Sequence, residues 1–157
     1  MKPGEPPARV PSPLRVVKRR RKEKGRKTSG TFFQIPTVVL NSPAFLSLSR
    51  KSRALLLDLG AQVRGYNNGD IAATYTMLRQ RGWTSKETLS LAITELLEKG
   101  LIQRTRQGYL GRCGLYAFTW MGIDECKGKL EVKANPVPSH LYKNATTAPI
   151  VGARLPR

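Results

Sequence analysis

The sequence predicts a mainly α-helical domain with a small β hairpin, carried between two basic tails that are disordered or extended. Charge is the first observation: residues 1–30 have a net charge of +9, residues 31–126 of +4 and residues 127–157 of +5, which together make +18. The second is that nearly all periodic apolar sequence lies in the middle segment. We therefore expect a basic Pro-rich tail over 1–30, one folded domain over 31–126 and a basic C-terminal extension over 127–157.

The first half of the domain predicts a short strand followed by helices. Residues 31–40 are β-branched and aromatic but interrupted by proline, which indicates an edge strand and a turn. Ser42 then caps a single helical turn that starts at Pro43. Ser49 caps a helix over 50–63. Its apolar face consists of four residues, widened by two more: Leu55, Leu56, Leu59 and Val63, then Ala54 and Leu57.

Two further helices follow, separated by a tight turn. Asp70 is expected to cap a helix that runs to about Gln80 and is stopped by Gly82. Thr84 begins a capping box with Glu87, and the next helix runs to Lys99, where Gly100 ends it. The apolar face of that helix is Leu89, Ala92, Ile93, Leu96 and Leu97.

The domain ends in a predicted β hairpin. Residues 101–106 (LIQRTR) and 115–120 (LYAFTW) are expected to be its strands, and the eight residues between them contain three glycines. The expected order of elements is helix, turn, helix, strand, Gly-rich loop and strand. Over roughly 48–120 this order resembles the winged helix-turn-helix family of DNA-binding domains, with the hairpin as its wing. The segments that carry the likeness are NNGDIAATYTML, QRGWTS, KETLSLAITELLEKG and LIQRTRQGYLGRCGLYAFTW.

This resemblance implies a set of nucleic-acid-binding residues. In such domains the second helix enters the major groove and the wing contacts a neighbouring groove or the phosphates. The base-reading stripe would be Lys86, Ser90 and Thr94. Thr84 and Ser85 would hold a phosphate at the helix N-terminus, and Arg79 and Arg81 would hold the backbone. Arg104, Arg106, Tyr109 and Arg112 would be the wing contacts.

The N-terminal tail predicts nonspecific attraction to phosphates. Its most basic run lies within residues 18–27, and the candidate contacts are Lys18, Arg19, Arg20, Arg21 and Lys22. A solubility tail or an import signal is the alternative interpretation of this run.

One helix face argues against DNA contact. The side of the 85–99 helix opposite its apolar stripe carries Glu87, Leu91, Glu95 and Glu98, and acids there repel phosphate. Either the N-terminal turn and the Lys86 flank alone approach DNA, or this face binds a protein partner or a second copy of the chain.

The sequence offers little for catalysis, metal binding or membrane insertion. It contains one histidine, its two cysteines are not spaced as a metal site, and no phosphate-binding loop is present. No apolar stretch is long enough to span a bilayer. We therefore expect no enzyme, no cofactor and no metal, in a cytoplasmic, nucleoid-associated protein.

The expected function is sequence-specific binding of double-stranded DNA, as a transcriptional regulator or replication accessory of a bacterium or mobile element. Two alternatives stay open. One is a protein-interaction adaptor whose basic tails alone bind nucleic acid, and the other is an RNA- or ribosome-binding protein.

Overall fold

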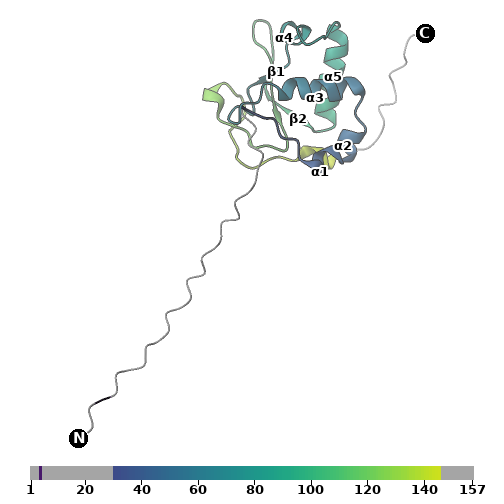
Figure 1. The fold of residues 1–157 in the computed structure, drawn as a ribbon. Coiled ribbons are helices and arrows are strands. Elements are labelled where there is room, and N and C mark those ends of the chain that lie inside the picture. Colours follow the sequence, from purple (N-terminus) through teal and green to yellow (C-terminus); the bar gives the residue numbers. More distant parts are fainter. Residues whose placement is uncertain (1–3, 5–29, 146–157) are drawn as a thin grey trace.

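The computed structural model describes residue 4 and residues 30–145 (Figure 1). Within these residues five α-helices, three strands and two 3-10 turns follow one another along the chain. In order, they are α1 (Thr37–Leu40), α2 (Pro43–Leu46), α3 (Arg50–Gly60), β1 (Ile71–Ala72), α4 (Tyr75–Arg79), α5 (Lys86–Glu98), β2 (Ile102–Arg106), β3 (Leu115–Phe118), η1 (Cys126–Gly128) and η2 (Leu141–Asn144).

Two of the predicted helix starts are confirmed by their caps. Ser42 Oγ accepts a hydrogen bond from the Phe45 amide at 3.2 Å, and Pro43 occupies the first helical position of α2. Ser49 Oγ accepts from the Ser52 amide at 3.2 Å and begins α3. Both hydroxyls satisfy amides that the first helical turn leaves without a backbone partner. Helix α3 ends at Gly60, three residues before the predicted end.

Helices α3 and α5 pack against each other through the faces that the apolar spacing predicted. The buried side chains are Leu55, Leu56, Leu59 and Val63 with Leu89, Ala92 and Leu96. The predicted widening of the α3 stripe is wrong, because Ala54 is exposed and Leu57 is 60% exposed. Only one side of α3 is covered, so the helix needs a narrower apolar face than the sequence contains.

A three-stranded antiparallel sheet covers the other side of this core. Strand β3 lies in the middle, paired with β1 (Ile71↔Tyr116) and with β2 (Ile102↔Phe118). All four residues of β3 are buried, as expected for a central strand with one neighbour on each side. Phe33 packs on Phe118 with ring centroids 4.7 Å apart, so the segment before α1 also closes the core.

This sheet overturns the predicted fold class of mainly α with a small β wing. Helices make up 38% and strands 13% of the described structure, and the strands form one three-stranded sheet rather than an isolated hairpin. The third strand, β1, consists of Ile71 and Ala72, which the sequence predicted to be helical. Both belong to the helix expected after Asp70, but pairing with β3 buries Ile71 as a strand residue.

Three local predictions about where strands and helices begin are wrong. The strand expected over 31–40 is absent: α1 begins after Pro36, whose fixed φ suits a helix start. Asp70 caps no helix; its carboxylate accepts from Lys129 Nζ at 2.6 Å, and α4 begins only at Tyr75. The cap of α5 is Ser85, one residue after Thr84.

Asn68 connects the loop before β1 to the end of β3. Its side chain is 1% exposed and makes four hydrogen bonds to backbone groups. Its Oδ1 accepts from the Phe118 amide at 2.8 Å, and its Nδ2 donates to the carbonyls of Phe118, Met121 and Gly122. A buried amide with all of its partners fixes the register of this loop against the sheet.

The C-terminal part of the described chain also packs onto the domain. Tyr142 is buried in the core beside η2. Gly100, with φ +66, lies so close to η2 that an added Cβ would stand 2.7 Å from the Leu141 carbonyl carbon. Residues 127–145 are therefore not an extended tail. No helix in residues 30–145 has the length and hydropathy needed to cross a bilayer.

Candidate nucleic-acid interface

The N-terminus of α5 is open to solvent. Ser85 Oγ accepts from the Thr88 amide at 3.2 Å, which leaves other amides of the first turn to face outward. Beside it lies a shallow hollow of about 180 Å³, whose lining includes Lys51, Arg81, Ser85 and Thr88. Asp58 also lines the hollow and pairs with Arg81, so the anion attraction here comes from Lys51 and the helix N-terminus. Thr84 makes its contact here through its carbonyl, which accepts from Tyr75 Oη at 3.0 Å.

One flank of α5 presents the three predicted base-reading residues together. Lys86, Ser90 and Thr94 are exposed and follow one another at intervals of four residues along the helix. Lys86 Nζ stands over the Tyr75 ring, 5.5 Å from its centroid, which orients the ammonium group next to α4. Hydroxyl and ammonium groups along one edge are suited to hydrogen bonding with base edges and phosphates.

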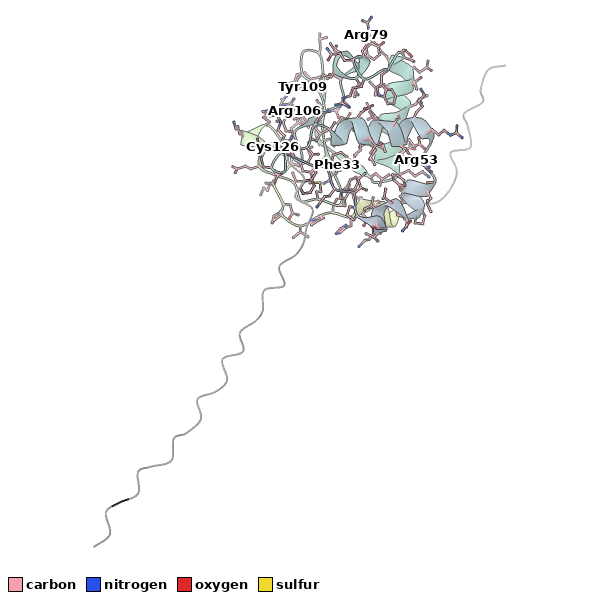
Figure 2. The ribbon with its side chains drawn as sticks, viewed as in Figure 1. Phe33, Arg53, Arg79, Arg106, Tyr109 and Cys126 are labelled. Atoms are coloured by element: carbon pink, nitrogen blue, oxygen red, sulfur yellow. The ribbon has the colours of Figure 1, made fainter. Side chains whose placement is uncertain are left out.

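The two arginines that precede α5 differ in their contacts with the rest of the protein. The side chain of Arg79, at the end of α4, is exposed. Arg81 Nη1 lies 3.3 Å from Asp58 Oδ1 of α3, while Asp58 Oδ2 accepts from Trp83 Nε1 at 2.8 Å. Asp58 therefore pins the α4–α5 turn to α3, and Arg81 reaches solvent with only part of its side chain. In the view of Figure 2, Arg79 and Tyr109 lie in the upper part of the domain, with Phe33 and Arg53 lower down.

Each hairpin arginine also has a partner within the hairpin. Arg104 Nη1 donates to Gln107 Oε1 at 2.7 Å, and its guanidinium stands over the Tyr116 ring. Arg106 donates from Nε and Nη2 to the Cys113 carbonyl at 3.2 and 3.0 Å, which ties the two sides of the hairpin together. Arg104 is therefore an exposed cation, whereas the half-buried Arg106 has a structural task.

The hairpin ends in a tight turn between Tyr109 and Arg112. Their backbone groups exchange two hydrogen bonds of 2.9 Å, and Arg112 Nη1 donates to Tyr109 Oη at 3.1 Å. That hydrogen bond raises the pKa of Arg112 above its ordinary value. Arg112 also lies 3.8 Å from Glu131, which screens part of its charge.

The acidic face of α5 differs from the prediction at Glu95. Its carboxylate does not point outward but accepts hydrogen bonds from the Ser49 amide at 2.8 Å, from Ser49 Oγ at 2.7 Å and from Ser52 Oγ. Glu95 thus joins α5 to the N-terminus of α3, where the helix dipole favours a negative charge. Glu87, Leu91 and Glu98 are exposed as predicted, with Leu91 at 65%. The outer face therefore carries two free acids, not three.

The electrostatics of Glu95 agree with this arrangement. Burial acts to raise its pKa, but hydrogen bonds from Ser49 and Ser52 and the charge of Lys99 outweigh it, so the pKa lies below the usual glutamate value. Glu95 is consequently charged at neutral pH, and its carboxylate is hydrogen-bonded to the N-terminus of α3.

The sequence-predicted residues fall into two groups and one remainder. The first group lies around α4 and α5: Arg79, Arg81, Thr84, Ser85, Lys86, Ser90 and Thr94. The second lies on the hairpin: Arg104, Arg106, Tyr109 and Arg112. The remainder, Lys18, Arg19, Arg20, Arg21 and Lys22, lies outside the described residues.

Sequence reasoning missed three residues that shape this surface. Asp58 and Glu131 brace it from distant parts of the chain, and no local pattern indicates such pairings. Leu110 at the hairpin tip is 99% exposed. The sequence GYLG places an apolar residue in a Gly-rich turn, and this pattern could have indicated the exposed leucine.

Comparisons of the chain with protein-family models, with curated proteins and with solved structures found no match. Among the described residues, no group of three or more His, Cys, Asp or Glu side chains is arranged to hold a metal ion.

Proposed function

We propose that the chain binds double-stranded DNA through the polar flank of α5 and the β2–β3 hairpin, with its basic tails adding nonspecific affinity. The role would be that of a transcriptional regulator or replication accessory of a bacterium or mobile element, associated with the nucleoid. The observation that carries the proposal is the division of the surface of α5. Lys86, Ser90 and Thr94 line one exposed flank, while Glu95 is hydrogen-bonded to Ser49 at the N-terminus of α3.

The charge of the hairpin supports the same proposal. The segment from Ile102 to Leu115 contains three arginines and no acidic residue. The chain as a whole carries +18, and such an excess attracts polyanions over a Debye length of about 10 Å at moderate salt. Phosphate contacts would position the protein, and the α5 flank would contribute base contacts.

One of the observations that favoured the adaptor alternative is changed by the contacts of Glu95. This alternative depended on an acidic and apolar outer face of α5, and Glu95 no longer belongs to that face. The resemblance to winged helix-turn-helix domains stays a prediction, with which the order α4, α5, β2, β3 is compatible.

Salt dependence tests phosphate contact directly. Affinity of the full chain for a duplex should fall steeply as salt rises, with a slope of about −0.9 per neutralised phosphate. The double variant Arg104→Gln/Arg112→Gln should reduce the magnitude of this slope by up to about 2. Arg106 is left intact because it holds the Cys113 carbonyl. Arg50→Gln/Arg64→Gln removes the same charge from exposed residues outside α5, the hairpin and the tails, and serves as the matched control.

Two further variants separate the domain from the tail. Replacing Lys18, Arg19, Arg20, Arg21 and Lys22 by Gln in the full chain should weaken binding to all duplexes but preserve any preference among them. Lys86→Ala should reduce that preference itself. An adaptor whose tail alone grips nucleic acid would lose all affinity with the tail variant. Stronger binding to folded RNA than to duplex DNA would favour the RNA alternative instead.

A further inference from the structure

The tip of the β2–β3 hairpin presents an apolar side chain to solvent. Leu110 is 99% exposed, the highest value among the large apolar residues of the described chain, and the neighbouring Tyr109 is 62% exposed. Leu110 therefore contributes nothing to the core, and its full apolar surface is available for burial in a complex.

The tip is held by a closely bonded turn. The backbones of Tyr109 and Arg112 exchange two hydrogen bonds of 2.9 Å, and Gly111 takes φ +81, which a residue with a Cβ rarely adopts. Arg112 stands over the Tyr109 ring, 5.5 Å from its centroid, and donates to its hydroxyl. Leu110 consequently projects from a short, braced turn rather than from a loose loop.

The base of the hairpin is braced as well. Arg106 donates to the Cys113 carbonyl across the hairpin, and Glu131 Oε2 accepts from the Gln107 amide at 2.9 Å. A stem fixed at both ends loses little conformational entropy when its tip is buried in a partner.

The charge around Leu110 indicates the partner. Arg104 and Arg112 flank an apolar tip in a hairpin segment that contains no acid, and Glu131 at the base of the hairpin lies 3.8 Å from Arg112. Duplex DNA offers the complementary arrangement, with phosphates on the outside of each groove and an apolar base stack within. Proteins that bind the minor groove use leucine and similar side chains as wedges between base steps.

We propose that Leu110 is such a wedge: the hairpin enters the minor groove, its arginines contact phosphates and Leu110 inserts between two stacked base pairs and kinks the duplex. This inference rests on the proposed DNA binding and adds a mode of recognition to it. Insertion costs unstacking energy, which is lowest at flexible pyrimidine–purine steps such as TA and highest in stiff A-tracts. The hairpin would therefore select DNA by deformability without hydrogen bonds to bases.

The experiment uses the full chain and two short duplexes, one with a central TA step and one with an uninterrupted A-tract. Each carries the fluorescent adenine analogue 2-aminopurine at its centre, and a second pair carries donor and acceptor dyes at its ends. Unstacking raises 2-aminopurine fluorescence, and bending raises energy transfer between the ends. The variants are Leu110→Ala and Leu110→Met, with Leu46→Ala as the matched control.

The controls follow from the structure. Leu46 is 61% exposed and belongs to α2, which lies at the lower end of the domain in Figure 1, away from α4. Leu110→Ala removes a side chain that is exposed over its whole surface, so thermal unfolding of this variant should be unchanged.

We expect the wild-type chain to raise both signals on the TA duplex and neither on the A-tract. Leu110→Ala should abolish the rise and weaken TA binding roughly tenfold, while Leu110→Met and Leu46→Ala behave as wild type. Salt-dependent binding with silent probes, or signals unchanged in Leu110→Ala, overturns the wedge and leaves the proposed function standing. Absence of salt-dependent binding by the wild-type chain overturns both.

Discussion

Glu95 provides a sharp test of how α5 is oriented. Its carboxylate accepts three hydrogen bonds from the first turn of α3, whereas the carboxylate of Glu98, one turn further on, is exposed. A hydrogen bond to a charged group contributes about 1.5–3 kcal/mol when protected and under about 1 kcal/mol where water reaches it. At roughly 0.7 kcal/mol for each of the three bonds, Glu95→Ala should lower the free energy of unfolding by about 2 kcal/mol.

The pH dependence of this contribution has a definite sign. The folded-state pKa of Glu95 is lowered, so its stabilisation is fully present above the unfolded-state pKa. It is lost as the pH falls through the lowered folded-state value. The difference in unfolding free energy between the wild-type chain and Glu95→Gln should therefore be largest at neutral pH and should shrink in acid below the usual glutamate range.

Urea denaturation at several pH values measures the stability difference, and duplex binding at low salt measures the functional one. Glu98→Ala is the matched control, with a stability change within about 0.5 kcal/mol. In DNA binding the order reverses: Glu87→Gln and Glu98→Gln should strengthen affinity by roughly threefold, and Glu95→Gln should change it less. If Glu95→Gln strengthened binding as much as Glu98→Gln, its charge would face the DNA and the assigned orientation of α5 would be wrong.

Three other outcomes follow from contacts in the fold. Asn68→Ala should cost about 3 kcal/mol of unfolding free energy, because it strands buried backbone groups; Asn67→Ala, at a more exposed position, should cost less than half as much in the same urea titration. Gly100→Ala should lower the melting temperature more than Gly111→Ala, because both have positive φ but only Gly100 lies against backbone atoms; equal losses would contradict the close packing of η2. Asp58→Ala should free the α4–α5 turn, which a red shift of tryptophan fluorescence and a several-fold loss of duplex affinity would reveal.

Local sequence signals were sufficient to predict a helix where the segment contained its own N-cap, apolar face and C-terminal glycine. The cap at Ser49, the four-residue apolar face predicted for the 50–63 segment and the apolar face of α5 are confirmed, whereas the widening by Ala54 and Leu57 is not. Gly100 ends α5 with Leu101 N donating to Leu96 O at 3.0 Å, as a C-terminal glycine predicts. These features depend on residues within one or two turns of each other, so a single sequence contains them.

The failures lie where a distant segment decides the local structure. Ile71 and Ala72 suit a helix by spacing, but β3, more than forty residues later, pairs with them and makes them a strand. Asp70 is a good helix cap in isolation, yet Lys129 takes its carboxylate. Local propensity is a weak prior, and pairing with a buried central strand outweighs it.

The same argument explains why the candidate interface was predicted only in part. The spacing of Lys86, Ser90 and Thr94 places them on one exposed flank, which a helical repeat alone dictates. The repeat does not reveal that Ser49 and Ser52 withdraw Glu95 from the outer face, since that contact joins residues 46 and 43 positions apart. An acid on a helix surface repels phosphate less strongly when a neighbouring helix N-terminus donates hydrogen bonds to its carboxylate. The polarity of a recognition surface is therefore a property of the packed helices and not of one helix, and substitutions in α3 should alter DNA affinity through Glu95 without touching DNA.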